Sequence, residues 1–146
     1  MIRGDGQKIF MVNDTKISTV ISFEGSFQRY IRNSVLDGAE LVVILTNQAS
    51  YGESGMSDQF ILMSRANAIS NERPIVHAAI TGKSAFIDHN GKVISKTELF
   101  ETMTLNEKLE VRQTETPYSK HGNYLNYIFI IFGALTFVRR FIRPVD

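Results

Sequence analysis

A short, uninterrupted apolar run near the middle of the chain limits the folds that are open to it. The segment Leu41–Leu45 reads Leu-Val-Val-Ile-Leu, with no polar residue in alternate positions. Such a run suits a strand that is buried on both faces, at the centre of a sheet. The preceding segment carries the helical period, because Phe27, Ile31 and Val35 recur every four residues. We therefore expect helices that cover a mostly buried sheet.

The other expected elements continue this alternation. β-Branched residues favour an extended strand from near Lys8 to Ile21. Helices are expected over 26–37 and 57–71, with Ser57 as N-cap, and strands over 75–81, 84–88 and 92–96, the last two joined by a hairpin turn at Asp88-His89-Asn90-Gly91. Strand, helix, strand, helix and then a β-meander indicate an α/β layered fold.

Composition excludes several classes of function. The 146 residues carry a formal net charge of +1, so no basic surplus indicates a nucleic-acid partner. The chain has no cysteine and can form no disulfide, thiolate metal site or thiol nucleophile. The three histidines, His77, His89 and His121, share no spacing that is typical of metal ligands, and we expect neither a metal nor a cofactor.

Polar residues at strand ends are the candidate site. Ser22 and Glu24 follow the first predicted strand and precede a helix, which is where α/β enzymes often display a nucleophile. The polar, glycine-rich segment 46–55 follows the central strand and is well placed to line a site. The alternative, a strand-end serine beside a solvated carboxylate, stays open from these residues alone.

A series of motifs in order resembles the apolipoprotein N-acyltransferases over nearly the whole chain. Ile21-Ser22-Phe23-Glu24 resembles the isoleucine-cysteine-aromatic-glutamate element of that family, and Ser22 stands where the family has its nucleophilic cysteine. Thr46–Gly52 resembles the family's loop of threonine or serine, asparagine, commonly aspartate-alanine, an aromatic residue and glycine. Further matches follow at Met63–Ala68, Arg73-Pro74, Ala79–Ala85, Ile87–Gly91 and Thr116–Asn123.

The resemblance implies a fold and a reaction. The fold is the C-terminal half of a nitrilase-type α-β-β-α sandwich, over residues 1–116. The reaction transfers a fatty acyl group from a phospholipid, through a covalent enzyme intermediate, to the N-terminal amine of a diacylglyceryl-cysteine lipoprotein. Ser22 would hold the nucleophile position, Glu24 would position the substrate amine or a neighbouring loop, and Phe23, Asn47 and Tyr51 would contact substrate.

The same resemblance implies an incomplete site. In the family a glutamate base and a lysine lie upstream of the cysteine element, and the 21 residues before Ser22 are too few to contain them. We therefore expect a C-terminal fragment that is inactive alone and whose partner is the missing N-terminal half. Because a serine hydroxyl is less acidic than a thiol, a catalytically dead, membrane-tethered remnant or partner subunit is an alternative, and a nitrilase-fold amidase is another.

The C-terminal segment predicts a membrane anchor. Tyr124–Val138 has no charge, and Arg139, Arg140 and Arg143 follow it. Its fifteen residues would span roughly 22 Å, short of the ~30 Å hydrocarbon core, but terminal tyrosines and arginines suit the two interfaces. We expect a connector over 117–123 and a transmembrane helix over 124–142 in the bacterial cytoplasmic membrane. The arginines would then be cytoplasmic and the α/β part extracytoplasmic; a buried C-terminal helix is the alternative.

Overall fold

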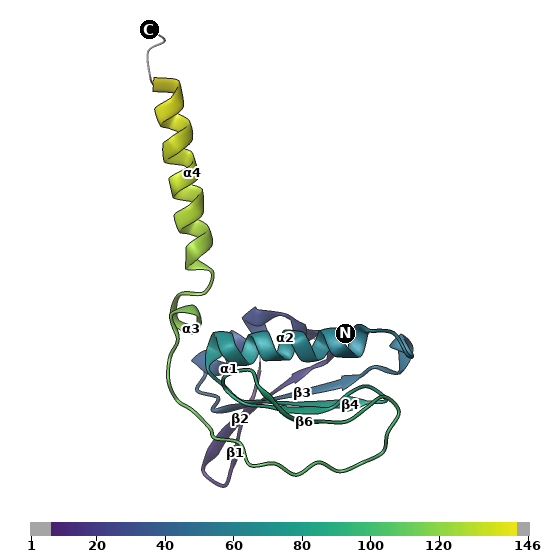
Figure 1. Ribbon diagram of the computed structural model, residues 1–146. Coiled ribbons are helices and arrows are strands. Elements are labelled where there is room, and N and C mark those ends of the chain that lie inside the picture. The colour runs from purple at the N-terminus through teal and green to yellow at the C-terminus, as the bar shows by residue number, and fades with distance from the viewer. Residues whose placement is uncertain (1–6, 143–146) are drawn as a thin grey trace, which may run out of the picture.

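Six strands form one mixed sheet in the computed structural model, which describes residues 7–142 (Figure 1). In spatial order the strands are β1 (Ile9–Val12), β2 (Thr15–Ile21), β3 (Leu41–Asn47), β4 (Ile75–Ile80), β5 (Ala85–Ile87) and β6 (Val93–Lys96). Strands β2, β3 and β4 are parallel, and the other neighbours are antiparallel. Ile21 pairs with Leu45, and Asn47 pairs with Ile80, so the three parallel strands end at the same edge.

Helices connect the parallel strands and cover one face of the sheet. They are the 3-10 turn η1 (Ser22–Ser26) with α1 (Gln28–Leu36) between β2 and β3, and the 3-10 turn η2 (Ala49–Tyr51) with α2 (Met56–Asn71) between β3 and β4. Both α1 and α2 lie on the same side of the sheet (Figure 1). The expected α/β layered fold, with Leu41–Leu45 inside a central strand, is confirmed.

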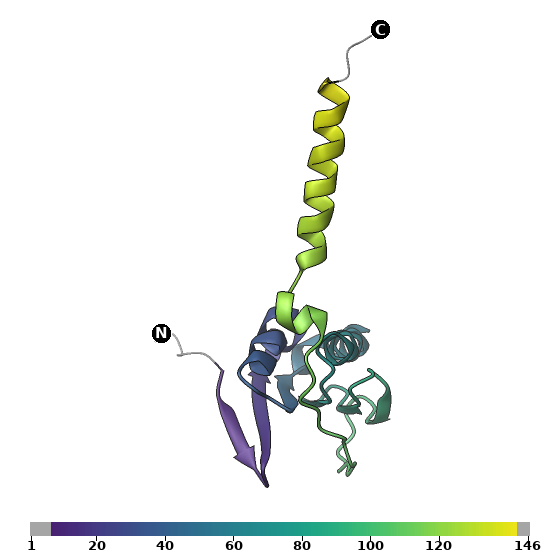
Figure 2. The same cartoon turned by 90° about the vertical axis from the view of Figure 1, so that its left-hand side faces the viewer.

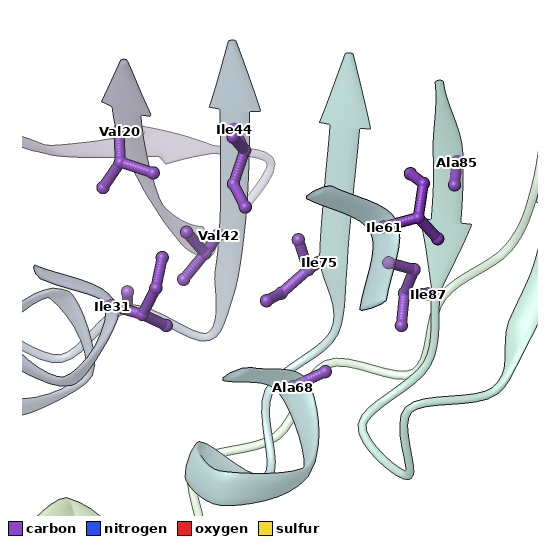
Figure 3. Packing of buried hydrophobic residues seen from close by; sticks show 10 residues of the cluster. Val20, Ile31, Val42, Ile44, Ile61, Ala68, Ile75, Ala85 and Ile87 are labelled. Atoms are coloured by element: carbon purple, nitrogen blue, oxygen red, sulfur yellow. The ribbon is translucent and has the colours of Figure 1, made fainter. Parts of the chain in front are cut away.

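The apolar core lies between the sheet and these two helices. Its strand residues point toward the helical layer, as the sticks in Figure 3 show. The cluster comprises Val20, Val42, Ile44, Ile75, Ala85 and Ile87 from the strands, Ile31 from α1, Ile61 and Ala68 from α2, and Ala39. Burial of these aliphatic side chains is the main source of the domain's stability.

The opposite face of the sheet is open. Ile21, Leu45 and Ile80 point away from the helical layer and are 64%, 44% and 65% exposed. Residues 97–116 run along this side without regular structure (Figure 1), and a hollow of about 610 Å³ lies between the start of that segment and β4 and β5. The described chain therefore supplies one helical layer and one sheet layer.

Three of the predicted strand and helix boundaries are wrong. The extended run from Lys8 to Ile21 is two strands, joined by a tight turn in which Asn13 and Asp14 have φ of 46° and 65°. The first helix begins at Gln28 rather than residue 26, because residues 22–26 form η1. The N-cap of α2 is Gly55, since the Ser57 hydroxyl is turned inward to the Gln48 side chain.

Two further helices follow residues 97–116. α3 (Pro117–His121) lies within the predicted connector, and α4 (Tyr124–Ile142) projects away from the domain in both views (Figures 1 and 2). The Arg32 guanidinium of α1 donates from Nε to the Tyr118 carbonyl at 3.1 Å and from Nη2 to the Lys120 carbonyl at 2.8 Å. These bonds hold α3 against the domain.

The expectation of a transmembrane helix is not supported. Among residues 7–142, no helix is long and apolar enough to cross a membrane. In α4, Arg139 and Arg140 follow an uncharged stretch of fifteen residues that is roughly 22 Å long. The cytoplasmic placing of the arginines stays a prediction. Arg143 lies outside the described residues.

Candidate active site

Ser22 lies in a strained turn at the end of a buried strand. It is the first residue of η1, directly after β2, and its side chain is exposed. Its φ of 56° falls in the left-handed region, which costs a non-glycine residue about 1 kcal/mol or more. Strain of this kind is typical of turns that present a nucleophile between a strand and a helix.

Glu24 closes the same turn. Its carboxylate Oε2 accepts a hydrogen bond from the backbone N–H of Ile21 at 3.1 Å, and its backbone carbonyl accepts one from Phe27 at 3.1 Å. The carboxylate is therefore hydrogen-bonded to the backbone next to Ser22. This contact favours a role for Glu24 in shaping the turn rather than in binding substrate directly.

An aromatic cluster joins the turn to the loop after β3. The Phe23 ring meets the rings of Tyr51 and Phe60 edge-on, with centroids 6.5 Å and 5.4 Å apart, and Tyr51 and Phe60 are 5.8 Å apart. Phe23 is 49% exposed, whereas Phe60 is buried. Two of the predicted substrate residues, Phe23 and Tyr51, are thus brought together beside Ser22, on a surface suited to an apolar ligand.

Asn47 has a local role in the same loop. Its Oδ1 atom accepts a hydrogen bond from the backbone N–H of Ala49 at 3.0 Å, which starts the turn η2. Side chains of this type commonly stabilise turns in this way. Asn47 therefore shapes the loop that carries Tyr51, and the residue is exposed.

A buried polar network anchors this loop to the core. Gln48 donates from Nε2 to His77 Nε2 at 3.2 Å and accepts a hydrogen bond from the Ser57 hydroxyl. His77 Nδ1 lies 3.0 Å from the Ser64 hydroxyl. Because Gln48 Nε2 can only donate, His77 Nε2 must accept, so the imidazole is neutral with its proton on Nδ1. Burial lowers the pKa of His77 from 6.5 to about 4.

The Ser22 hydroxyl has no hydrogen-bonded base within the part of the chain that the structure describes. Within residues 7–142 the Ser22 hydroxyl makes no hydrogen bond to another side chain. In the same range, no group of three or more histidine and acidic side chains could hold a metal ion. A hydroxyl needs an activating base to attack an acyl group, so Ser22 is a candidate nucleophile without a hydrogen-bonded base among the described residues.

Comparison with known protein families shows which family this chain belongs to. The carbon-nitrogen hydrolase family model matches residues 1–116. The chain belongs to the carbon-nitrogen hydrolase family. Among curated relatives, the apolipoprotein N-acyltransferase of Geobacter metallireducens is 32% identical over 129 residues, and that of Vibrio vulnificus is 30% identical over 129 residues. The resemblance to apolipoprotein N-acyltransferases is thereby confirmed.

These matches cover most of this carbon-nitrogen hydrolase chain but little of its relatives. They span 86% and 88% of this chain and only 25% and 26% of the two acyltransferases. The chain thus spans about a quarter of the length of these relatives.

Solved structures share the fold. The amidase of the nitrilase superfamily from Nesterenkonia sp. AN1 superposes with a TM-score of 0.58 at 16% identity, over 68% of this chain and 40% of that one. A carbon-nitrogen hydrolase from Helicobacter pylori G27 gives 0.58 at 13% identity, over 67% and 41%. The α/β nitrilase-type fold is confirmed, and the one helical and one sheet layer seen here correspond to part of it.

The sequence patterns did not single out the buried residues behind this candidate site. Gln48, His77 and Ser64 form the network under the loop, and Asn67 of α2 reaches the turn that carries Ser22. Phe60 completes the aromatic cluster. The only signal in the sequence is a helix whose polar residues Ser57, Ser64, Asn67 and Asn71 recur at helical spacing with its apolar ones. That spacing places them on the buried face.

Proposed function

We propose that this chain carries the nucleophile position of an apolipoprotein N-acyltransferase, within the carboxy-terminal part of its nitrilase-type domain. The observation that carries the proposal is Ser22, which holds a left-handed conformation at the end of β2 where the resembling family has its cysteine. The identities of 32% and 30% to curated acyltransferases support the choice of reaction. An amidase reading has less support, because the amidase likeness is one of fold at 16% identity.

The proposed chemistry has two steps. The Ser22 oxygen attacks the carbonyl carbon of a phospholipid ester, its proton passes to a base, and the lysophospholipid leaves, so that an acyl-serine ester remains. The α-amine of a diacylglyceryl-cysteine then attacks that ester, an amide forms, and the Ser22 hydroxyl is restored. Phe23 and Tyr51 would contact the acyl chain beside the ester.

The base and the cation are proposed to come from outside this segment. By the family resemblance they are a glutamate and a lysine that precede the nucleophile element in the chain. The open face of the sheet, with Ile21, Leu45 and Ile80 exposed, gives the preceding part of a nitrilase-type domain a surface to cover. This chain alone should therefore show no acyl transfer.

Membrane association is part of the proposal. α4 exposes apolar side chains on all sides; Tyr127, Phe129 and Ile130 are 68%, 70% and 67% exposed. A helix that is apolar all round needs apolar surroundings. We propose that α4 inserts these side chains into the bacterial cytoplasmic membrane, with the α/β domain on the outer face near its lipid substrates.

The serine at position 22 favours a second candidate. A hydroxyl is harder to ionise than a thiol, so a site tuned for cysteine loses rate with serine. The second candidate is a membrane-tethered remnant or partner subunit that keeps the acyltransferase fold and no longer performs the reaction. The two candidates differ only in the turnover of the native serine.

The test is a chimaera that joins the preceding part of the Geobacter metallireducens acyltransferase to this chain at the start of β2. Acylation of a diacylglyceryl lipopeptide by phospholipid is measured in detergent for the chimaera with Ser22, Ser22→Cys and Ser22→Ala. Turnover by the serine form supports the enzyme, and turnover by Ser22→Cys alone supports the inactive remnant. If a folded Ser22→Cys chimaera is inert while the Geobacter enzyme is active, the proposal is wrong.

A further inference from the structure

The turn that carries Ser22 is held from two sides. On the exposed side, the Glu24 carboxylate accepts the backbone N–H of Ile21. On the buried side, the Asn67 side chain of α2 donates from Nδ2 to the backbone carbonyl of Gly25 at 2.9 Å. The turn lies close against β3, because a Cβ atom on Gly25 would be only 2.6 Å from Ile44 Cγ2. The left-handed conformation of Ser22 is therefore set within a turn that is fixed at both faces.

Asn67 destabilises the fold at its buried position. Its side chain is 1% exposed, and its Oδ1 atom is buried without a hydrogen-bond partner. An unsatisfied buried acceptor destabilises a fold, so an apolar residue of similar size would serve packing better. The Asn67 side chain donates a single hydrogen bond, and its acceptor lies in the turn of the candidate nucleophile.

We propose that Asn67 is a positioning residue, whose bond to Gly25 keeps residue 22 in its left-handed conformation at the end of β2. The inference deepens the proposed function, on which it rests for the role of residue 22. Asn67 acts through the backbone of the turn and touches no reacting atom. Loss of the bond frees the Gly25 carbonyl, and the turn then relaxes toward conformations that a serine or cysteine prefers.

The chain contains a matched control on the same helix. Asn71 lies one turn after Asn67, is fully buried and also has an unpartnered Oδ1 atom. Its Nδ2 atom, however, donates to the Asn67 backbone carbonyl within α2, at 3.0 Å, and not to the turn. Replacing Asn71 therefore removes a buried amide of equal kind without touching the bond to Gly25.

The experiment uses the full chain with Ser22→Cys, so that the thiol reports on its own position. Asn67→Leu and Asn67→Ala are compared with Asn71→Leu and Asn71→Ala. Three quantities are measured: the backbone coupling and ¹³C shifts of residue 22, which report φ; the rate of thiol alkylation by iodoacetamide as a function of pH; and the midpoint of thermal unfolding. Neither phospholipid nor the rest of the enzyme is needed.

We expect both Asn67 variants to move residue 22 out of the left-handed region and to shift the pH profile of alkylation. The left-handed population should fall about tenfold, the size expected for the loss of one buried hydrogen bond. The Asn71 variants should lower the unfolding midpoint and leave both the φ of residue 22 and the alkylation profile unchanged. Equal effects at both positions, or none at Asn67, would overturn the proposal.

A measurement without substitution at Asn67 guards against variants that fail to fold. In the Ser22→Cys chain, the Asn67 side-chain amide protons should show NMR contacts to the Gly25 α protons and should exchange slowly with solvent. Absence of both would refute the bond itself. If these results hold but phospholipid never acylates the chimaera, the proposed function fails while the positioning role stands.

Discussion

His77 is the residue whose chemistry depends most clearly on its burial. Its side chain is 1% exposed between β4 and α2, and it accepts the Gln48 amide at Nε2. A second proton on the ring would set two donors, Nε2–H and the Gln48 amide, against each other. Protonation must therefore break the network that anchors the loop carrying Tyr51.

The pKa of His77 predicts how stability depends on pH. Because burial lowers this pKa from 6.5 to about 4, the unfolded chain binds a proton that the folded chain excludes over that range. Stability is then full above pH 6.5 and falls as the pH drops toward 4, by about 3 kcal/mol in total. Urea unfolding of the native chain and of His77→Gln between these pH values measures the effect.

The substitution His77→Gln should weaken the dependence of stability on pH, because glutamine does not titrate. An NMR titration should show one neutral ring form, with the proton on Nδ1, down to about pH 5. Equal slopes for both proteins, or a ring that protonates near pH 6.5 in the folded state, would show that desolvation does not control this histidine.

At the scale of elements, α4 is the part whose surroundings matter most. Its exposed apolar side chains predict binding to lipid vesicles. We expect the full chain to sediment with phosphatidylethanolamine–phosphatidylglycerol vesicles and a chain that ends at Asn123 to remain in the supernatant. Ile130→Lys should weaken binding about thirtyfold, by the free energy of burying one isoleucine.

The matched control for α4 is Ile94→Lys, which adds the same charge to an exposed isoleucine of β6. It should leave vesicle binding unchanged, because β6 belongs to the domain and not to the projecting helix. Sedimentation that is independent of α4, or a full chain that stays in the supernatant, would contradict membrane insertion by this helix.

The order of elements could be predicted from the sequence, and several of their ends could not. Leu41–Leu45 predicted a central strand because an unbroken apolar run has few other places to lie, and β3 confirms it. The hairpin at Asn13 and Asp14 was missed because the β-branched content of the run outweighed its turn residues. The segment Tyr124–Val138 predicted a helix correctly but not its relation to a membrane.

The candidate site, like the fold, could be predicted from the sequence only in part. A resemblance in short motifs placed Ser22, Phe23 and Tyr51 near one edge, and the aromatic contact between Phe23 and Tyr51 agrees with it. The supporting residues Gln48, His77 and Asn67 could not be found, because each bond joins elements that are far apart in the sequence. Pairing of that kind depends on how the helices dock on the sheet, which local patterns do not specify.

At the scale of the whole molecule, this chain spans only part of the length of its relatives. It matches about a quarter of the curated acyltransferases and about 40% of a nitrilase-fold amidase, and its sheet has one open face. A nucleophile, its base and an oxyanion-stabilising cation must lie within a few ångströms of each other for acyl transfer. We therefore predict activity only when the open face is covered by the part that brings the base and the cation.

Mass spectrometry can locate the acyl group on the chain. The Geobacter chimaera with Ser22→Cys is incubated with phospholipid and no acceptor, digested, and analysed by mass spectrometry. We predict one fatty acyl group on the peptide that contains residue 22, attached as a thioester that neutral hydroxylamine cleaves, and no adduct in Ser22→Ala. A folded chimaera whose residue 22 stays unmodified, while the Geobacter enzyme is acylated in parallel, would show that residue 22 is not the nucleophile position.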